Sequence, residues 1–376
     1  MKRARRRWLI AAALAAALSA LAAGAGSASA ASTQIEEGWS VIRNWPPGGG
    51  STAPYDYAPT VIEEDGFQRI WWCGMGPDQL DDIYYAKIRL SDGAFVEGPG
   101  PVLTPRYDRS WQGLSVCDPT VVRGAFLPGD GHAYRYAMYY TASSLGTGPP
   151  GGIGVVYSDD GITWNGQTAP YNPIIDTVGN CQPRYGVGQA EAWNQNGLGN
   201  VYLFFTDTCR TQNPGNPGTT WVTHSVDQSG YHLAPPVQLS SAGIGAPWHG
   251  LIWNNAFAVD SQSGLLYVAA PNWRWCANGG PAEMPAFGVY SMPVWTAVTG
   301  GGTWTHEFQA TAGDDGSLPN GGACNADRIH SPGFVRNGTG DLAPLKAGGI
   351  RLLMARDNGN IYNSELFMHR WTDPHP

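Results

Sequence analysis

The stretch CDPTVVRGAFLPGDGHAYRYAMYYTAS, residues 117–143, contains the pattern that decides the fold. A short apolar strand comes first, a turn rich in Gly and Asp follows, and a second strand rich in Tyr ends the stretch. The same order of features returns at four other places, which begin at Tyr57, Gln189, Asn254 and His330. The strand starts are spaced by about 60 to 75 residues, and they lie near Ala58, Asp118, Gln189, Asn255 and Ser331.

Repeats of this length, each with two to four strands, are typical of the blades of a β-propeller. Helical patterns are weak, since no stretch of about 12 residues combines a 3.6-residue period with capping residues. One repeat can bury its sheet faces only against neighbouring repeats, so the repeats belong together. We therefore predict an all-β fold, a single-domain five-bladed β-propeller over residues 31–376. A strand within residues 38–44 is expected to close the ring against the last blade.

Residues 1–30 have the features of a secretory signal peptide. Five basic side chains precede the apolar run WLIAAALAAALSALAA, and Ala28-Ser29-Ala30 offers a small-residue cleavage site. Arg5-Arg6-Arg7 also resembles a twin-arginine signal, so both export routes stay open. No later apolar run approaches the roughly 20 residues of a membrane helix. We expect a secreted, extracellular and monomeric protein that does not contact the membrane after signal removal.

The charge of the chain argues against a polyanionic partner. Removing the signal takes away five of the 22 basic residues and no acidic one, so the formal net charge goes from −8 to −13. Binding to nucleic acid needs clustered Lys and Arg side chains, and only Lys87 and Lys346 remain as lysines after cleavage. We therefore expect no nucleic-acid partner.

All six cysteines lie after the signal peptide, and an even number in an exported chain predicts disulfides. The shortest pairing without crossings is Cys73–Cys117, Cys181–Cys209 and Cys276–Cys324, although the sequence does not fix the connectivity. Zinc is not expected, because no CxxC or HxxxH spacing occurs.

Polar side chains stand at the starts of the five inner strands. In a propeller these starts meet at one face, so residues far apart in the sequence converge on one pocket. The residues there are Asp56, Asp118, Glu191, Asn254, Asn255, Asp327 and His330. Three carboxylates at three successive starts, Asp56, Asp118 and Glu191, are the strongest candidates for acid–base chemistry.

The phrase CDPTVVR, followed by YAMYYTAS and IGVVYSDDGITW, resembles the five-bladed glycoside hydrolases of family 43, of the arabinanase, β-xylosidase and arabinofuranosidase type, and their β-fructosidase relatives. That resemblance implies Asp56 as general base, Asp118 as the second Asp that orients and tunes, and Glu191 as general acid. In register, however, Ala58 stands where the second repeat has Asp118. Asp56 lies two residues earlier, which is one period of a β-strand, so its side chain should point to the same side of the strand as that of residue 58. Asp118 as the base, with Asp327 as a further candidate, remains the alternative.

Such a hydrolase needs one protonated acid and one charged carboxylate. An inverting enzyme holds them roughly 6.5–9.5 Å apart, with the attacking water between. Crowded acids and apolar surroundings raise the pKa of one member. The neighbours of Glu191 are Ala190, Ala192 and Trp193, which favour it as the acid.

Aromatic and polar side chains near the strand starts are candidates for binding sugar. The chain has 16 Trp residues, and the indole face can stack on the C–H face of a sugar ring. The predicted substrate-binding residues are Trp111, Trp193, Trp248, His249, Asn255, Trp273 and Asp327. The family resemblance also implies a structural calcium or sodium ion in the central channel with His330 beside it; a hydrogen-bonded histidine without metal is the alternative. Hydrolysis itself would require no cofactor.

Two functions follow from these expectations. The first is a secreted glycoside hydrolase that cleaves a neutral polysaccharide or oligosaccharide containing arabinose or xylose, the sugars being implied by the family resemblance. The second is a non-catalytic, lectin-like propeller that binds glycan or protein with the same aromatics, because a fold does not fix a function.

Overall fold

The computed structural model describes the backbone of residues 35–42, 55–106, 111–143, 151–165, 171–176, 186–210, 219–244, 254–271, 286–311, 328–343, 349–357 and 365–371. These ranges lie in a unit that spans Thr33–Pro376. Within them, strands and turns account for nearly all of the chain, and the helix α2 (Val294–Ala297) has four residues. No helix in the described ranges is long and apolar enough to cross a membrane.

Each sequence repeat forms one antiparallel unit of strands. The first unit contains β2 (Asp56–Glu64), β3 (Phe67–Met75), β4 (Asp81–Arg89) and β5 (Phe95–Leu103). The second contains β6 (Ser115–Phe126), β7 (Tyr134–Ser143) and β8 (Ile153–Ser158). The third contains β9 (Val187–Asn194), β10 (Val201–Asp207), β11 (Thr220–His224) and β12 (Val237–Gln238). The fourth contains β13 (Ala256–Asp260), β14 (Leu265–Pro271), β15 (Ala286–Pro293) and β16 (Thr305–Thr311). The fifth contains β17 (Arg328–Arg336), β18 (Ile350–Asp357) and β19 (Glu365–Trp371), and β1 (Ile35–Ile42) pairs with β19.

The all-β propeller arrangement is confirmed, but the strands form four sheets and not the five separate blades predicted from the sequence. The first and last units share one eight-stranded sheet, in the order β1-β19-β18-β17-β2-β3-β4-β5. Their joint is a short parallel pairing between β17 and β2, at Val335 with Val61 and Arg336 with Ile62. In the sequence the two units are separate repeats. In the structure, backbone pairing between their inner strands joins them into one sheet.

The strand within residues 38–44 that was expected to close the ring corresponds to β1. It pairs antiparallel with β19, the last strand of the chain. An early segment of the sequence therefore covers the outer edge of the last unit, which protects that edge.

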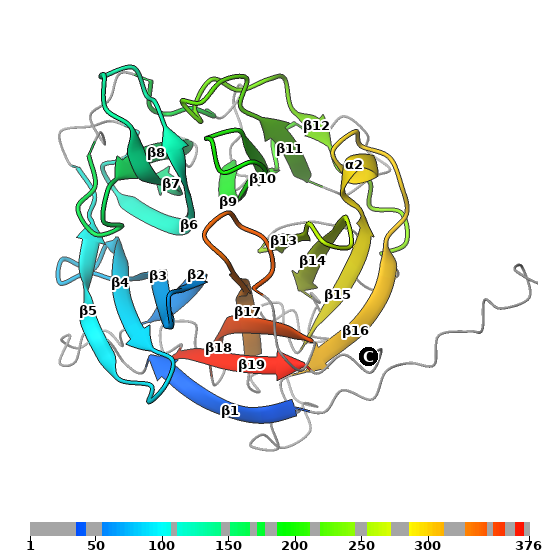
Figure 1. The fold of residues 1–376 in the computed structure, drawn as a ribbon, viewed down its shortest axis with the longest axis horizontal. Coiled ribbons are helices and arrows are strands. Elements are labelled where there is room, and N and C mark those ends of the chain that lie inside the picture. The colour runs from blue at the N-terminus through cyan, green and yellow to red at the C-terminus, as the bar shows by residue number, and fades with distance from the viewer. Residues whose placement is uncertain are drawn as a thin grey trace, which may run out of the picture. The chain divides into compact units, whose positions relative to one another are not determined.

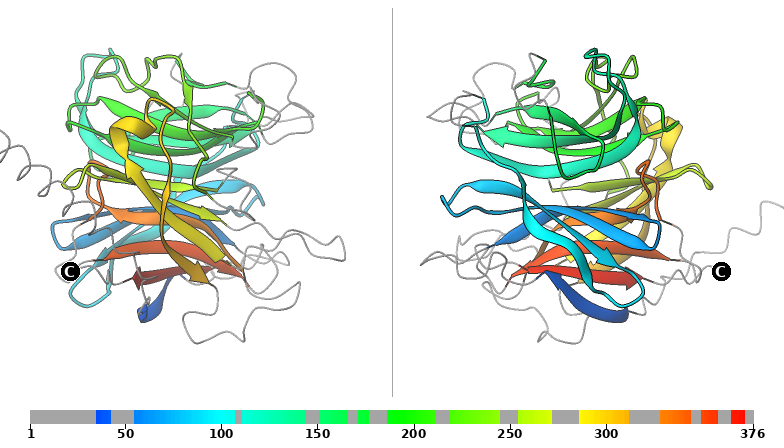
Figure 2. Two further views of the ribbon diagram at one scale, coloured as in Figure 1. Left: turned by 90° about the vertical axis from the view of Figure 1, so that its right-hand side faces the viewer. Right: turned by 60° about the vertical axis from the view of Figure 1, so that its left-hand side comes forward.

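The first strand of every unit lies on the inside of the arrangement. Figure 1 shows β2, β6, β9, β13 and β17 around a common centre, with the later strands of each unit farther out. The views in Figure 2 show neighbouring sheets lying with their faces toward one another. Buried side chains fill the spaces between sheets; Trp71 and Tyr85, for example, pack with Tyr136 and Met138 of the next unit.

One end of the centre is crossed by the segment after β17, residues 337–343, which we call the plug (Figure 1). Its backbone bonds to three other units: Arg123 N donates to the Gly338 carbonyl at 2.5 Å, and Asn194 N donates to the Thr339 carbonyl at 2.8 Å. Leu342 N donates to the Val259 carbonyl at 2.8 Å. Gly340 has φ +93°, and a Cβ there would lie 2.7 Å from the carbonyl oxygen of Ala192. A glycine is therefore needed where the plug meets β9.

The turn that follows β8 is held together by hydrogen bonds to the side chain of Asp160. Asp160 Oδ1 accepts hydrogen bonds from the backbone N–H groups of Ile162 at 2.8 Å and Thr163 at 2.7 Å. The Nε1–H of Trp71 donates to the carbonyl of Gly161 at 2.8 Å, which ties this turn to the first unit. The role of the turn is to connect neighbouring units.

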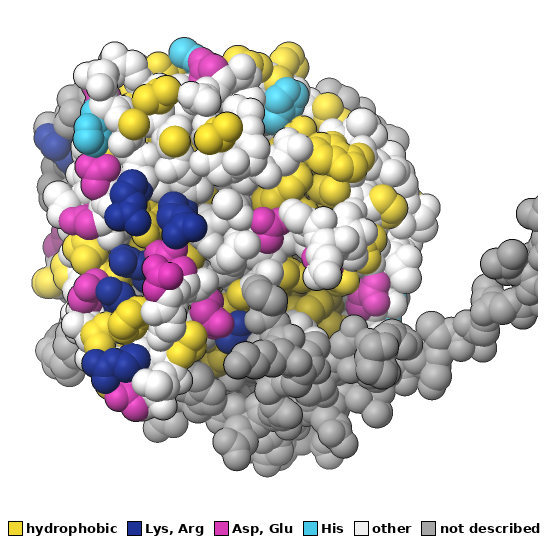
Figure 3. Space-filling model, in the orientation of Figure 1, with side chains coloured by type: hydrophobic (Ala, Val, Ile, Leu, Met, Phe, Trp, Pro, Cys, Tyr) yellow, Lys and Arg dark blue, Asp and Glu magenta, His cyan; other side chains and the backbone are white. Residues whose placement is uncertain are grey.

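Basic side chains on the face with the plug are interleaved with acidic ones (Figure 3). Arg123 Nη1 lies 2.8 Å from Glu64 Oε2, and Arg69 Nε lies 3.2 Å from Glu64 Oε1. Arg351 Nη1 lies 2.6 Å from Glu63 Oε2. Local carboxylates thus offset the charge of these arginines.

The expected disulfides include Cys73–Cys117, one pair of the shortest non-crossing pairing, which joins β3 of the first unit to β6 of the second. Cys209 is also disulfide-bonded, and the remaining three cysteines lie outside the described residues. Replacing Cys73 and Cys117 together by serine is expected to lower the free energy of unfolding by about 2–4 kcal/mol, because the crosslink closes a long loop in the unfolded chain. Urea unfolding measures this, and an unchanged midpoint would contradict the expectation.

Candidate active site

Five residues with left-handed backbone conformation stand at equivalent places at the starts of the inner strands. They are Ala58 (φ 49°), Asp118 (φ 46°), Gln189 (φ 52°), Asn254 (φ 54°) and Ser331 (φ 46°). Residues other than glycine rarely adopt this conformation. Its recurrence therefore shows that all five units have the same local backbone structure at this point. It coincides with breaks in strand register, as between Tyr57 and Thr60 and between Cys117 and Thr120. Such bulges redirect the side chains at a strand start.

These five residues surround a hollow in the protein. Residues from all five inner strands line it: Ala58, Pro59, Asp118, Pro119, Gln189, Ala190, Glu191, Asn254, Asn255, Ser331 and Pro332. The convergence of strand starts predicted from the sequence is therefore confirmed. Two carboxylates, Asp118 and Glu191, are in this lining, and no Lys or Arg is among its described residues.

Glu191 lies in β9 and is buried, with 9% of its surface exposed. Its Oε2 accepts a hydrogen bond from the Thr120 hydroxyl at 3.1 Å and lies 2.9 Å from Arg336 Nη1. Burial raises the pKa of Glu191 to about 7, the Arg336 charge and the Thr120 bond oppose this rise, and the charge of Asp118 adds to it. A carboxyl with such a pKa carries its proton for much of the time near neutral pH, which suits a general acid.

Asp118 stands at the bulge of β6, next to the disulfide-bonded Cys117. It is partly exposed, and it belongs to the pocket lining. The left-handed conformation favours glycine, but Asp tolerates it better than most residues. A carboxylate can therefore stand at this position. A partly solvated carboxylate beside a protonated one is the arrangement that acid–base hydrolysis needs.

Arg336 was not singled out in the sequence, although a charged residue inside the apolar phrase SPGFVR is an available indication. It lies at the end of β17 with 1% of its surface exposed. Besides its contact with Glu191, Nη1 donates to the carbonyl of Ala192 at 3.0 Å. Nη2 donates to the hydroxyls of Thr60 and Thr120. One guanidinium group therefore connects β17 with β2, β6 and β9.

Asp56 is not in the pocket lining, in contrast to the expectation from its facing. Its side chain is fully buried, and Oδ1 accepts a hydrogen bond from Trp72 Nε1 at 2.6 Å. The bulge at Ala58 explains the difference, since the pairing of β2 with β3 shifts between Tyr57 and Thr60. The two-residue alternation used for the prediction does not hold across a bulge.

The predicted sugar-binding residues have different positions in the structure. Asn255 lines the pocket, and its Nδ2 donates to Thr220 Oγ1 at 3.0 Å. Trp193 does not, because it is 4% exposed and packs in the interface between the third and fourth units. Trp111 packs against Tyr140 and is also absent from the lining. Four predicted residues lie outside the described ranges: Trp248, His249, Trp273 and Asp327.

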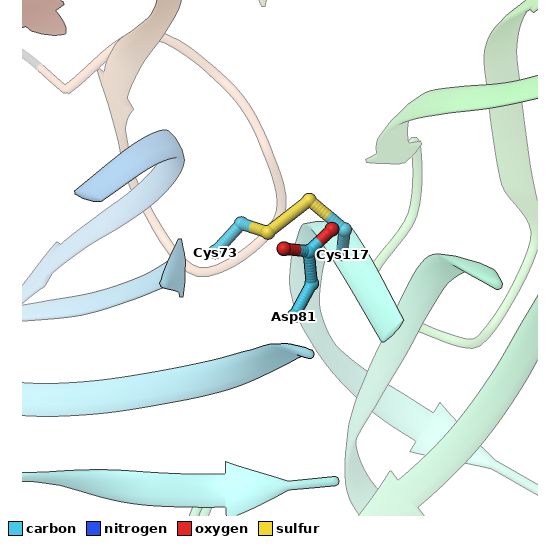
Figure 4. A group of neighbouring side chains, drawn as sticks. All are labelled: Cys73, Asp81 and Cys117. Atoms are coloured by element: carbon cyan, nitrogen blue, oxygen red, sulfur yellow. A yellow bond between two sulfur atoms is a disulfide. The ribbon is translucent and has the colours of Figure 1, made fainter. Parts of the chain in front are cut away.

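The described residues do not fit a calcium ion beside His330. Its side chain is 6% exposed, its Nδ1 lies 3.2 Å from Ser331 Oγ, and its ring lies 6.3 Å from that of Tyr57. Among the described residues, one group of three potential ligands lies close together, namely Cys73, Asp81 and Cys117. Its two sulfur atoms are joined in the disulfide, with the Asp81 carboxylate beside them (Figure 4). At neither place do the described residues offer the six to eight oxygen ligands that calcium prefers.

Asp81 leads to a prediction about pH. Burial, and then the charge of Asp118, raise the pKa of Asp81 to about 7; burial raises the pKa of Asp82 and that of Glu191 to about 7 as well. The corresponding pKa values in unfolded chains are about 4, so between pH 4 and 7 the folded chain holds protons that the unfolded chain has lost. The free energy of unfolding should therefore fall as pH rises through this window.

Replacing Asp81 by asparagine removes one of these ionisations. We expect the variant to melt a few degrees higher than wild type at pH 8, and at a similar temperature at pH 5. Asp65→Asn is the matched control, because Asp65 is exposed and already has φ 52°, which asparagine tolerates. A variant that melts below wild type at pH 8 as much as at pH 5 would refute the effect of ionisation.

The comparisons with known proteins concern the fold. No protein-family model matches the sequence, and no curated protein matches it. Among solved structures, an α-L-arabinofuranosidase from Podospora anserina in complex with cellotriose is similar, with a TM-score of 0.52 and 14% identity over 89% of this chain and 96% of that chain. The chain has the fold of that enzyme.

Two further structures agree with this assignment. The catalytic domain of a GH62 α-L-arabinofuranosidase from Coprinopsis cinerea has a TM-score of 0.52 and 13% identity, over 90% of this chain and 96% of that chain. A thermostable family-43 glycoside hydrolase has a TM-score of 0.51 and 12% identity, over 88% and 96%. The resemblance to family 43 seen in the sequence is confirmed at the level of the fold, and at such low identity it concerns the fold alone.

Proposed function

We propose that this chain is a glycoside hydrolase in which Glu191 is the general acid and Asp118 the general base. The observation that carries the proposal is that these two carboxylates, from different repeat units, line one hollow at the starts of the inner strands. Asp56, which the family resemblance implies as base, is buried against Trp72 on the other side of a bulge.

The surroundings of each carboxylate would determine whether it acts as the acid or as the base. Glu191, with its raised pKa, gives its proton to the leaving oxygen of the glycosidic bond. Asp118, which is more exposed, stays charged and removes a proton from the attacking water. The bond from the anomeric carbon to the leaving oxygen breaks as the bond to the water oxygen forms. Acid–base hydrolysis of this kind needs no cofactor.

The substrate we propose is a neutral glycan with arabinose or xylose residues. Among its described residues, the lining has two carboxylates and no basic side chain, which disfavours an anionic sugar. Two of the similar structures are named as α-L-arabinofuranosidases, which makes a terminal arabinofuranosyl group the first substrate to examine. Export by means of residues 1–30 and a monomeric state belong to the proposal; N-terminal sequencing of the exported protein and its mass in solution test them.

A panel of substrates tests the function. The purified protein is incubated with arabinoxylan, arabinan, xylan, fructan and 4-nitrophenyl α-L-arabinofuranoside, and released sugar is quantified. Proton NMR then follows the first anomer formed. Release of arabinose with inversion at the anomeric carbon is expected. Retention would contradict the role of Asp118 as a base, because a retaining enzyme uses its second carboxylate as the nucleophile.

The lectin-like alternative has one observation in its favour. Ala58 occupies the place in β2 that Asp118 occupies in β6, so the described pocket lining has two carboxylates and not three. Under this alternative the same panel shows binding by calorimetry and no turnover. Binding together with turnover would exclude it.

A further inference from the structure

The buried guanidinium of Arg336 lies below the pocket, where the inner strands come together. Its contacts are short and directional: 2.9 Å to Glu191 Oε2, 3.0 Å to the Ala192 carbonyl and 3.1 Å to Thr120 Oγ1. With 1% of its surface exposed, it has almost no contact with water. A buried cation of this kind is costly unless its charge and its N–H groups are matched, and here Glu191 provides the matching charge.

The same contacts fix the orientation of the acid. Within the described part of the chain, Arg336 and Thr120 both bond to Oε2 of Glu191. Oε1 is then the oxygen that can meet a substrate in the pocket. A planar guanidinium restrains a carboxylate in this way more effectively than a single ammonium group does.

The charged groups that face Glu191 come from two other inner strands. Arg336 in β17 lowers the pKa of Glu191, whereas Asp118 in β6 raises it. β2 contributes the hydroxyl of Thr60 to the cluster, and the uncharged Asn255, directly before β13, lines the pocket. The protonation of Glu191 therefore depends on one cation, one anion and the burial of the site.

We propose that Arg336 is a fixed cation among the inner strands: it positions Glu191, sets the protonation of this acid, and supplies positive charge in the channel for which the resemblance to family 43 implies a metal ion. The hydroxyls of Thr60 and Thr120, which could otherwise coordinate an ion, are occupied by the guanidinium. The catalytic meaning of the Glu191 protonation rests on the proposed function, whereas the electrostatic link itself does not.

Two substitutions separate charge from packing. Arg336→Gln removes the charge and keeps hydrogen-bonding capacity, and Arg336→Lys keeps the charge. Arg351→Gln is the matched control, because Arg351 is a partly buried arginine that pairs with Glu63 and not with Glu191. The ionisation of Glu191 is followed by carbon NMR of protein labelled at the Glu side-chain carboxyls; the resonance that Glu191→Gln removes identifies Glu191.

The expected result is an upward shift of the Glu191 titration in Arg336→Gln by about one pH unit or more, since an ion-paired partner is lost. Arg336→Lys should titrate near wild type, and Arg351→Gln should titrate like wild type. If the variants turn over substrate, the alkaline limb of the pH–rate profile moves in the same direction, because the acid must be protonated. An unshifted Glu191 titration in Arg336→Gln would overturn the proposal.

A second measurement uses the wild-type protein and stands even if Arg336→Gln does not fold. Its melting temperature is expected to be the same with calcium and with a chelator, because the channel already holds a cation. If calcium raises the melting temperature of the wild-type protein, and raises that of Arg336→Lys by a similar amount, the proposal is overturned. A shifted Glu191 titration in a protein without any turnover would leave the role of Arg336 intact and reject the glycosidase function. Turnover of substrate together with an unshifted Glu191 titration would support the glycosidase function and reject the role of Arg336.

Discussion

Replacing Glu191 by glutamine is expected to reduce kcat on arabinoxylan by about 10²–10⁴-fold, while the affinity for the same glycan stays within a few-fold of wild type. Glutamine keeps the shape and can still accept the hydrogen bonds of Thr120 and Arg336, but it has no proton to give to the leaving oxygen. Steady-state kinetics and calorimetry on the same preparation measure the two effects.

The chemistry of the leaving group provides an internal check on this expectation. A 2,4-dinitrophenyl glycoside leaves with little protonation, so Glu191→Gln should lose much less activity on it than on arabinoxylan. Glu97→Gln is the matched control, because Glu97 pairs with Lys87 at 3.1 Å and is absent from the pocket lining. Equal losses on both substrates would mean that Glu191 acts in some way other than as a general acid.

The second large effect is expected for Asp118→Asn, again about 10²–10⁴-fold in kcat. Asparagine tolerates the left-handed conformation at φ 46°, so the bulge and the disulfide next to it should persist. The loss would then come from the missing base and not from a change of fold. Circular dichroism and a melting curve check the fold, and added azide, which can attack without a base, should restore part of the turnover.

Asp56→Asn is the control for this second prediction. Asp56 accepts the Trp72 Nε1–H bond in a fully buried setting, so we expect a lower melting temperature and a kcat within a few-fold of wild type. The opposite outcome, with activity lost in Asp56→Asn and kept in Asp118→Asn, would restore the assignment of Asp56 as the base.

The sequence repeats could be aligned with one another correctly because each contains the same backbone feature, a left-handed residue at the start of its inner strand. Ala58, Asp118, Gln189 and Ser331, four of the expected strand starts, have the same left-handed conformation, and Asn254 precedes the fifth. Reading the repeats in register therefore brought Asp118, Glu191 and Asn255 into one pocket.

The predictions that failed depended on what happens within and between the repeats. A bulge cannot be recognised from a two-residue alternation, and for this reason Asp56 was expected to face the pocket. Trp193 follows Glu191 by one strand period, but farther along β9 the same side packs against the fourth unit. The number of sheets was wrong because the pairing of β17 with β2 uses backbone groups, which leave no mark in the side-chain pattern.

Arg336 was missed for a related reason. Its partners Thr60, Thr120 and Glu191 come from three other repeats and lie between 145 and 276 positions away in the sequence. Only the convergence of the inner strands brings them together. A charge in an otherwise apolar inner strand is the feature that could have identified it.

A crystal structure of the Glu191→Gln variant with a bound arabinoxylan oligosaccharide shows whether the hollow is the active site. We expect an arabinofuranosyl ring in the hollow, with its glycosidic oxygen within hydrogen-bond reach of the side chain at position 191. We also expect that Asp118 holds a water on the opposite side of the anomeric carbon. A sugar bound elsewhere on the protein, or a ring in the hollow with Asp118 out of reach of any such water, would contradict the proposed function.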